Sequence, residues 1–362
     1  MNIKKRGDKY TCVIDVGTDG ERKQKRITKS TKKEVLAAIH EIKSQVNKGS
    51  FIEPSKMTFT DITNKWLEEK ENDLRYSTLK TYKQVLKSNI LPKLGHLKIS
   101  KITHGTLTSF VTQMNKEYKK NYVAKHIALL KMIFEYALYH KHIVTNPTIK
   151  IVKKEERKTV NSVWSEEEVK SFLEVARTYS YYPAFLIAIS CGCRRGEILG
   201  MSWDAIDFEN GNIYITQTLS SDGKLLEEKA KTEQSIRTIK VPSNVLAELK
   251  VLKDEFEVKK NVLKGNYLKY NLVVSSKEGT PINPRNIGRS MDSIIKKAGV
   301  PRITFHSLRH AHATLLMQKG VNIKVVSERL GHSKIQTTMD IYTHVPTTLQ
   351  DEAAEIFGNI IK

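Results

Sequence analysis

A run of six consecutive charged residues near the middle of the chain limits what it can fold into. The run, Lys153-Lys154-Glu155-Glu156-Arg157-Lys158, contains no side chain that a hydrophobic core accepts readily. At 362 residues the chain is also longer than a single core usually supports. We therefore expect residues 151–160 to form a linker, with the segments on either side folding separately.

The N-terminal residues have a pattern typical of two strands and a helix. Residues 10–16 and 22–28 have strand character, and Thr31 and Glu34 form a capping box at the start of a helix with one apolar face. The second strand carries four basic side chains, Arg22, Lys23, Lys25 and Arg26. A basic strand can lie in a DNA groove, although a solvated edge strand whose lysines deter aggregation explains the same residues. We predict a DNA-binding domain over residues 1–56, with these four residues as contacts.

The next segment, residues 57–150, is predicted to be helical throughout. Stretches near 60–70, 77–90, 104–118 and 121–142 each have helical periodicity. The clearest apolar face belongs to the last stretch and consists of Val123, Ile127, Leu130, Phe134 and Leu138. The Asn146-Pro147 pair ends this helical domain.

The charge of the chain is large and unevenly distributed. Its 61 Lys and Arg against 39 Asp and Glu leave a net charge of +22, which attracts polyanions. Residues 1–160 hold 34 basic and 16 acidic residues (+18), whereas residues 161–362 hold 27 and 23 (+4). We interpret the first part as mainly nucleic-acid-binding. On charge alone, a basic ribosome-associated protein or an ordinary soluble protein remains an alternative.

Other classes of protein fit the sequence poorly. No run of about 18 apolar residues is present, and the N-terminus lacks the apolar stretch of a secretory signal. We expect a soluble, cytoplasmic protein without membrane contact. The three cysteines, Cys12, Cys191 and Cys193, are too few and too badly spaced for a disulfide framework and are expected to be small buried residues.

The last segment, residues 161–362, is predicted to be mainly helical with one β interruption. Ser165 and Glu168 form a capping box at its start. Between about 212 and 241, Ile213, Ile215 and Ile239 alternate with polar residues as in a half-buried sheet. The fold class that we expect for the whole chain is mainly α with small β elements (α+β), in three domains.

Five short groups of polar residues stand out in this last segment. They are Gly192-Cys193-Arg194-Arg195-Gly196-Glu197, Ala230-Lys231-Thr232, Thr304-Phe305-His306-Ser307-Leu308-Arg309-His310, Leu330-Gly331-His332 and Asp340-Ile341-Tyr342-Thr343-His344. With Thr304 as N-cap, His306, Arg309 and His310 share one face near a helix N-terminus, which favours an anion. Gly331 ends a helix and leaves His332 on a turn. Glu197, three residues after Arg194, can hold that arginine in place.

This set of side chains suits phosphoryl transfer without a metal. A phosphodiester under attack needs its non-bridging oxygens neutralised, a nucleophile, and an acid for the leaving oxygen. Two arginines, two histidines, a lysine and a tyrosine provide all of these. Because the unperturbed pKa of tyrosine is about 10, the nucleophile also needs its proton removed and its developing charge held by the surrounding cations.

The order of these groups along the chain and their amino-acid sequences resemble the tyrosine recombinase family. The pattern is Cys-Gly-Cys-Arg-Arg-Gly-Glu, then Lys-Thr, then His-Ser-Leu-Arg-His, then Leu-Gly-His, then Thr-Thr-Met-Asp-Ile-Tyr-Thr-His-Val. It is most similar to integrases of temperate phages and conjugative transposons of low-GC Gram-positive bacteria. The resemblance covers the whole chain and implies an arm-binding domain (1–56), a helical core-binding domain (57–150) and a catalytic domain (161–362). Cys191 stands where the family usually has threonine, a change between small residues.

The resemblance also implies roles for individual residues. Arg194 and Arg309 would clamp the scissile phosphate, and Tyr342 would attack it. Lys231 would protonate the departing 5′ oxygen, although Lys224, Lys229 and Lys240 lie on the same predicted hairpin. His306 would accept or position a proton and His332 would hydrogen-bond the phosphate. Glu197 would contact the catalytic residues and not the phosphate, and would hold them in place.

The expected substrate is double-stranded DNA with core and arm attachment sites. The resemblance implies a 3′-phosphotyrosyl intermediate, a homotetramer on DNA and, in some members, an excisionase or a DNA-bending host factor, all at the bacterial nucleoid. No cofactor is expected, and no GxxxxGK[ST] phosphate loop is present. The apolar face of residues 349–360 is expected either to pack on a neighbouring protomer or to cap its own domain.

Two other functions compete with this interpretation. A metal-dependent hydrolase would use His306, His310 and His312 with His332 or His344, because His-x₃-His suits a metal on a helix. Arg309 lies between the first two and would repel a cation, and no glutamate follows His306 as a zincin requires. A non-catalytic DNA-binding regulator would fit the charge equally well. It gives no reason for the arginines, lysine and tyrosine to occur together.

Overall fold

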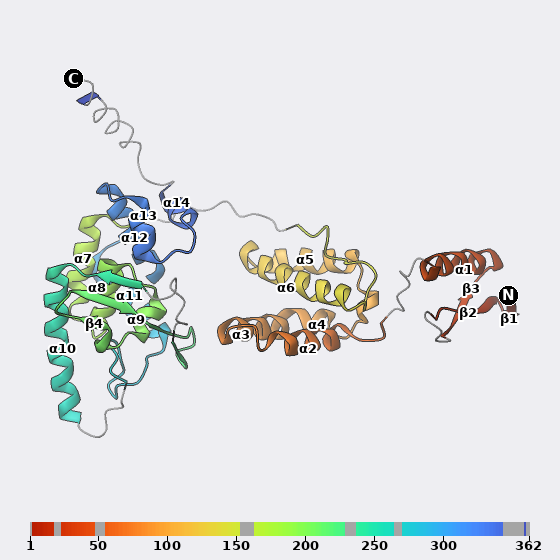
Figure 1. Ribbon diagram of the computed structural model, residues 1–362, viewed down its shortest axis with the longest axis horizontal. Coiled ribbons are helices and arrows are strands. Elements are labelled where there is room, and N and C mark those ends of the chain that lie inside the picture. Colours follow the sequence, from red (N-terminus) through yellow and green to blue (C-terminus); the bar gives the residue numbers. More distant parts are fainter. Residues whose placement is uncertain are drawn as a thin grey trace. The chain divides into compact units, whose positions relative to one another are not determined.

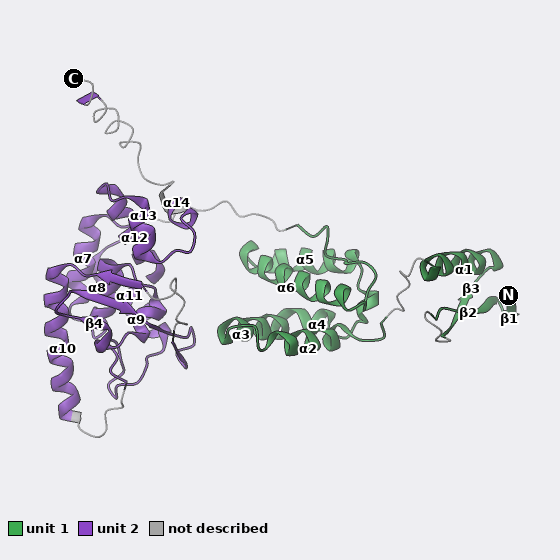
Figure 2. Ribbon diagram, in the orientation of Figure 1, with its two compact units in different colours: residues 1–157 green, residues 158–362 purple. Residues whose placement is uncertain are grey.

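The computed structural model describes residues 2–17, 23–47, 55–152, 163–228, 237–263, 270–342 and 358–359. The chain divides into two compact units, residues 1–157 and 158–362 (Figure 2). This boundary falls within the predicted linker 151–160. The division of the chain into three domains stays a prediction.

The first unit begins with a three-stranded antiparallel sheet of order β1-β2-β3, followed by helix α1 (Figure 1). The elements are β1 (Lys4–Arg6), β2 (Lys9–Asp15), β3 (Gln24–Lys29) and α1 (Lys32–Asn47). The predicted capping box is present, because Glu34 N–H donates to Thr31 Oγ1 (3.2 Å) and Thr31 N–H donates to Glu34 Oε2 (3.1 Å). Val35 and Ile39 of α1 are buried against the sheet as expected. Strand β1 was not predicted, since all three of its residues are exposed and basic.

The strand register gives this sheet one covered face and one open face. Cys12, Ile14 and Ile27 point toward α1 and form its hydrophobic core. On the opposite face, Thr11 lies beside Lys4, Lys9 beside Arg6, and Val13 beside Arg26. Four basic side chains therefore share the open face and are exposed: Lys4, Arg6, Lys9 and Arg26. Lys25 is on the face covered by α1, where it is the cross-strand partner of Ile14.

The rest of the first unit is helical, as predicted. Its elements are α2 (Phe59–Lys70), α3 (Tyr76–Val85), a π-helical turn (Leu86–Ile90), α4 (Leu91–Leu94), a 3₁₀ turn (Ile99–Lys101), α5 (His104–Glu117) and α6 (Lys120–Tyr139). The π turn replaces the last part of the helix expected to end at residue 90. Pro92 has no N–H to donate to the carbonyl of Ser88. The preceding residue, Leu91, donates its N–H to the carbonyl of Leu86, five residues back, which is the hydrogen bond of a π-helix.

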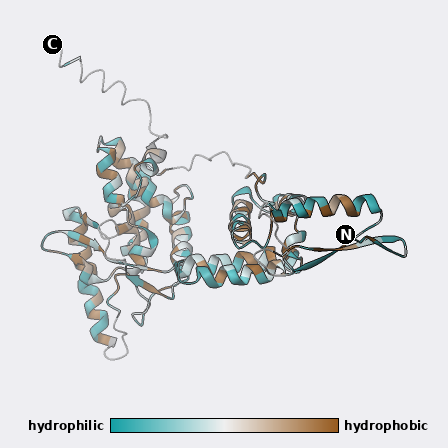
Figure 3. Ribbon diagram, turned by 45° about the vertical axis from the view of Figure 1, so that its right-hand side comes forward, coloured by the Kyte–Doolittle hydropathy of each residue, from teal (hydrophilic) through white to brown (hydrophobic). Residues whose placement is uncertain are grey.

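Hydrophobic and hydrophilic residues alternate along the ribbon of these helices (Figure 3), and their apolar residues contribute to one buried cluster. Val123, Ile127, Leu130 and Phe134 of α6 are all buried as expected. Leu138 was expected on the same buried face, but it is 38% exposed. It lies in the last turn of α6, where the preceding residue, Ala137, takes the buried position instead.

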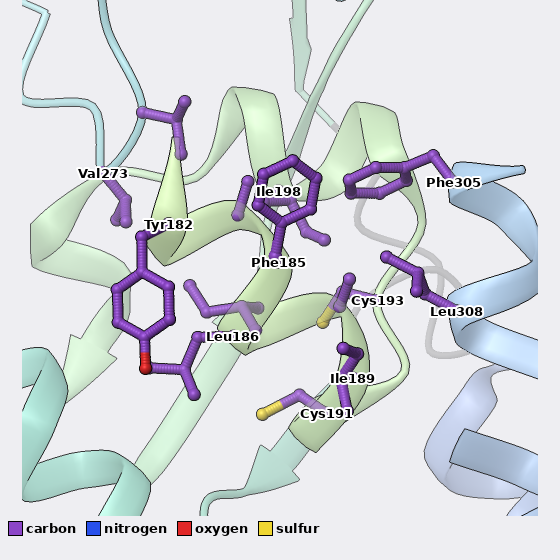
Figure 4. Close-up of a cluster of buried hydrophobic side chains, with 14 of the residues drawn as sticks. Tyr182, Phe185, Leu186, Ile189, Cys191, Cys193, Ile198, Val273, Phe305 and Leu308 are labelled. Atoms are coloured by element: carbon purple, nitrogen blue, oxygen red, sulfur yellow. The ribbon is translucent and has the colours of Figure 1, made fainter. Parts of the chain in front are cut away.

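The second unit is built around helix α8 (Tyr182–Cys191). Nine of its ten residues are buried, as expected for a helix that is apolar on all sides. It contacts α7, α9, α10 and α12. Phe185 of α8 and Phe305 of α12 face one another in the core, beside Leu308 and Ile198 (Figure 4). The helices are α7 (Glu166–Ala176), α9 (Arg195–Gly200), α10 (Ser243–Leu263), α11 (Pro284–Ala298), α12 (Phe305–Gln318), α13 (Ile323–Leu330) and α14 (Gln336–Tyr342).

The predicted β interruption consists of two small antiparallel sheets, of order β4-β5-β8 and β6-β7. The strands are β4 (Ile206–Asp207), β5 (Asn212–Ile215), β6 (Gln217–Leu219), β7 (Leu226–Glu228) and β8 (Arg237–Lys240). Ile213, Ile215 and Ile239 are buried, as their alternation predicted. The mainly α fold with small β elements is thus confirmed. Within the described ranges, no helix has both the length and the apolar character needed to cross a membrane.

Candidate active site

The end of α8 and the start of α9 place the first of two arginines that are held by hydrogen bonds within the protein. Gly192 ends α8 in the left-handed region (φ +65°), and a Cβ there would lie 2.7 Å from His312 Cδ2. Arg194 is the N-cap of α9. Its N–H donates to Glu197 Oε2 (2.8 Å) and its guanidinium donates to Glu197 Oε1 (3.0 Å), so the predicted support by Glu197 is present. The same guanidinium donates to the carbonyl of Gly331 (2.9 Å).

Arg309 on α12 is the second of these arginines and is only 2% exposed. Its guanidinium donates to the carbonyls of Gly192 (2.7 Å) and Leu330 (2.6 Å). These carbonyls lie at the C-terminal ends of α8 and α13, where helix carbonyls lack partners and the helix dipole is negative. Burial, together with the charges of Arg194 and Arg237, lowers the pKa of Arg309 to about 9. A bound anion would relieve this crowding of cations.

Two of the predicted histidines lie beside these arginines and are neutral at pH 7. Burial lowers the pKa of His306 and of His332 to about 4, and the charges of Arg309 and Arg194 act in the same direction on both. The rings of His306 and His310 are 4.7 Å apart and nearly perpendicular. His332 follows Gly331 on the turn after α13, as predicted, and its Nδ1 lies 2.8 Å from Thr338 Oγ1.

The third histidine of the competing metal site, His312, is not available to a metal. Its Nδ1–H donates to the carbonyl of Ile189 (2.7 Å), and its Nε2 accepts from Arg329 Nε (3.1 Å). Both ring nitrogens are therefore occupied, and burial lowers the pKa of His312 to about 4. In the described part of the chain, no group of three or more His, Cys, Asp or Glu side chains could hold a metal ion.

Two further arginines belong to this cluster and were missed in the sequence. Arg237, the first residue of β8, donates to both oxygens of Glu197 (2.9 and 2.8 Å). Arg329 of α13 donates to the carbonyls of Lys240 (2.9 Å) and Ser190 (3.1 Å), in addition to His312. An arginine in a strand or helix is usually solvated. Nothing in the sequence distinguished these two from the other basic residues.

Several predicted residues lie outside the part of the chain that the structure describes. Among them are Arg22, Lys231, His344, the side chain of Tyr342 and residues 349–357. Helix α14, which ends at Tyr342, contacts both α12 and α13. Of the alternative lysines, Lys224 is exposed, Lys229 is outside the described ranges, and Lys240 Nζ donates to the carbonyl of Asn210.

Two family models match the chain. The model described as phage integrase family matches residues 162–348, and the one described as phage integrase, N-terminal SAM-like domain, matches residues 58–115. The first match spans more than half of the 362 residues and includes every predicted catalytic residue.

Curated relatives align along nearly the whole chain. A tyrosine recombinase XerC-like protein of Caldanaerobacter subterraneus subsp. tengcongensis is 29% identical, with 99% of this chain and 98% of the relative covered. The ICEBs1 integrase of Bacillus subtilis is 25% identical, with 100% of both chains covered. The integrase of Staphylococcus phage L54a is 26% identical, with 88% of this chain and 98% of the relative covered.

Two solved structures show that the fold is shared. A fragment of the Tn1549 transposon integrase in complex with a circular intermediate DNA matches with a TM-score of 0.70 at 19% identity, covering 83% of this chain and 100% of the fragment. A lambda integrase dimer bound to a COC′ core site matches with a TM-score of 0.61 at 19% identity, covering 79% of this chain and 95% of the other.

Proposed function

Since the chain belongs to the phage integrase family of tyrosine recombinases, we propose that Tyr342 attacks the scissile phosphate of one DNA strand while Arg194 and Arg309 hold that phosphate. The protein is a site-specific DNA recombinase, an enzyme that cleaves and rejoins DNA. The observation that carries the proposal is the arginine cluster. Arg194 and Arg309 both donate to carbonyls at the end of α13, Gly331 and Leu330, and Arg309 also donates to Gly192 at the end of α8. His306 and His332 lie beside them.

The proposed step exchanges one phosphodiester for another. The Tyr342 hydroxyl oxygen forms a bond to phosphorus, the bond from phosphorus to the 5′ oxygen breaks, and a 3′-phosphotyrosyl link results. Lys231 gives the departing 5′ oxygen its proton, and His306 accepts or positions the tyrosine proton. A phosphate bound between the arginines would offset the positive charges that lower the pKa of His306 and would make it a better base. The 5′ hydroxyl reverses the step on the new partner strand, so no ATP is needed.

The two parts of the first unit would hold separate DNA sites. The open face of the β1-β2-β3 sheet, with Lys4, Arg6, Lys9 and Arg26, suits an arm-type site. The helical residues 57–150 would hold the core site beside the cleaved bond. The predicted contacts Lys23 and Lys25 stay predictions of this proposal, as does Arg22.

We place this reaction in the bacterial cytoplasm, at the nucleoid, where it would integrate or excise a phage genome or another mobile element. Four protomers would join two duplexes through a Holliday junction. An excisionase or a DNA-bending host factor would act on the direction of the reaction. The proposed chemistry uses no metal or other cofactor, because side chains supply the cations, the base and the acid.

The test is trapping of the covalent intermediate. A duplex nicked just after the scissile phosphate loses its short cleaved product, so the wild-type protein should accumulate as a protein–DNA adduct on a denaturing gel. Tyr342→Phe should bind the same duplex and form no adduct, because only the attacking oxygen is removed. Tyr270→Phe, which changes a tyrosine that is 45% exposed, is the matched control and should form the adduct at the wild-type rate. An adduct with the Tyr342→Phe variant would exclude Tyr342 as the nucleophile.

A further inference from the structure

Glu197 is a buried carboxylate held by two arginines of different elements. It is 3% exposed, and each of its two oxygens accepts one hydrogen bond from Arg194 and one from Arg237. Arg194, the N-cap of α9, donates to Oε1 from the guanidinium and to Oε2 from the backbone. Arg237 of β8 donates to Oε1 (2.9 Å) and to Oε2 (2.8 Å). This two-bond geometry is the strongest form of an arginine–carboxylate pair.

The two arginines differ in what else they can reach. The side chain of Arg237 is 11% exposed, and its Nε–H donates a hydrogen bond to the carbonyl of Arg329 (3.1 Å). Its nitrogens are therefore occupied inside the protein. The side chain of Arg194 is 42% exposed and keeps part of its guanidinium open to a ligand. Arg237 faces Glu197, and Arg194 faces both Glu197 and the solvent.

The charges of this triad explain what Arg237 contributes. Two guanidiniums and one carboxylate carry a net charge of +1, which Arg194 presents at the surface. Without Arg237, the pair of Arg194 and Glu197 would be neutral, and the buried carboxylate would draw the Arg194 guanidinium toward itself because its paired hydrogen bonds from Arg237 are lost. A phosphate at Arg194 would then meet a misaligned group with less charge.

We propose that Arg237 is a positioning residue for cleavage: it neutralises and orients Glu197, so that the guanidinium of Arg194 is aligned and free to neutralise the scissile phosphate. The inference rests on the proposed function, in which Arg194 holds that phosphate. A competing route exists, since Arg237 is also the first residue of β8 and follows the segment 229–236 that contains Lys231. Arg237 would then act by anchoring the proton donor.

Three nicked duplexes that differ only at the scissile linkage separate these routes. The first carries the ordinary phosphodiester. The second carries a methylphosphonate, in which a methyl group replaces a charged non-bridging oxygen, so the demand for a neutralising arginine falls. The third carries a 5′-bridging sulfur, whose thiolate leaves without a proton donor. The rate of adduct formation by Arg237→Gln is compared with the wild-type rate on each duplex, and binding is measured by gel shift.

We expect Arg237→Gln to slow cleavage of the phosphodiester by roughly 10- to 100-fold, by analogy with the loss of a hydrogen-bond partner that orients a metal ligand, with binding unchanged. On the methylphosphonate the defect should fall to about twofold or less, and on the bridging sulfur it should persist. If the defect disappears on the bridging sulfur, Arg237 acts by positioning the proton donor Lys231, and the inference is overturned. An equal defect on all three duplexes would reduce Arg237 to a purely structural role and would also overturn it.

Three variants serve as controls. Arg237→Lys keeps the charge but not the paired hydrogen bonds, and should recover part of the lost rate. Glu197→Gln combined with Arg237→Gln should be no slower than the slower single variant, because both changes act on one group. Arg302→Gln removes an exposed arginine paired with Asp292 and should leave all three rates unchanged. A failure of the proposed function itself would appear differently, as a wild-type protein that forms no adduct on any duplex.

Discussion

Arg309 donates a 2.7 Å hydrogen bond to the carbonyl oxygen of Gly192, the residue at which helix α8 ends. With its second bond, to the carbonyl of Leu330, it connects the ends of two helices through a single buried guanidinium. Arg194 differs, because its side chain is 42% exposed and its carboxylate partner has a second arginine. The two arginines proposed to bind the same phosphate therefore contribute differently to stability.

Removal of each arginine should separate these contributions. Arg309→Ala leaves two buried carbonyls without donors and should lower the free energy of unfolding by roughly 3 kcal/mol, whereas Arg194→Ala should lower it by about 1 kcal/mol or less. Both should slow adduct formation by about 100-fold or more, because each removes a donor to charge that develops in the transition state. Urea denaturation and the nicked-duplex assay measure the two effects. Equal losses in DNA binding and in rate would mean that these arginines only hold DNA.

The stability of the second unit should depend on pH through His312. Its folded pKa of about 4 lies below the ordinary value of 6.5, so the unfolded chain binds more protons between these values. Stability is complete above about pH 6.5 and is lost as the pH falls toward 4. From pH 7 to pH 5 this histidine alone should lower the free energy of unfolding by about 2 kcal/mol. Urea denaturation at the two pH values, compared with His312→Gln, measures it; the variant should lose this part of the pH dependence. An unchanged dependence in the variant would assign the effect to other groups.

Cleavage and rejoining should survive metal chelation. The cations proposed for the reaction belong to arginine and lysine side chains, and both nitrogens of His312 are already occupied. Adduct formation in EDTA should proceed at the rate measured with added Mg²⁺, without ATP. Loss of cleavage in EDTA, restored by Zn²⁺ or Mn²⁺, would favour the metal-dependent hydrolase instead.

Deletion of residues 1–56 should separate cleavage from integration. The deletion removes 14 basic and 7 acidic residues, including the open basic face of the β1-β2-β3 sheet, and leaves the residues proposed for cleavage intact. The shortened protein should form the Tyr342 adduct on a core site but fail to integrate DNA. Its binding to longer attachment DNA should be less salt-sensitive, by about 0.9 in log–log slope for each lost phosphate contact. Normal integration would make residues 1–56 dispensable, and loss of core cleavage would make them part of the catalytic fold.

The sequence predicted those features that short-range patterns determine. The predicted capping boxes at Thr31 and Ser165 and the predicted N-cap Thr304 correctly located the starts of three helices. Strand β1 was missed because three exposed basic residues show no alternation. The π turn was missed because it lies next to a single proline, Pro92, two residues beyond the predicted helical stretch 77–90.

In the candidate site too, the sequence predicted contacts between neighbouring residues and missed those that depend on tertiary packing. The spacing of Arg194 and Glu197 predicted their contact, since three residues along a helix determine it. The contact between Arg237 and Glu197 joins residues 40 positions apart and depends on how the tertiary fold brings the first residue of β8 to α9. No local pattern carries that information. The resemblance to a family supplied the role of Lys231, but its side chain lies outside the described ranges.

The protein's own groups fix both arginines: Glu197 and the carbonyl of Gly331 hold Arg194, and the carbonyls of Gly192 and Leu330 hold Arg309. The clamp that we propose is thus preorganised, and little of the free energy of DNA binding is needed to order it. A preorganised clamp for phosphate has a second consequence, because the phosphate is the same at every base step. It cannot distinguish one nucleotide sequence from another. The choice of target must then come from contacts to base edges and from the shape of the DNA, made by other residues.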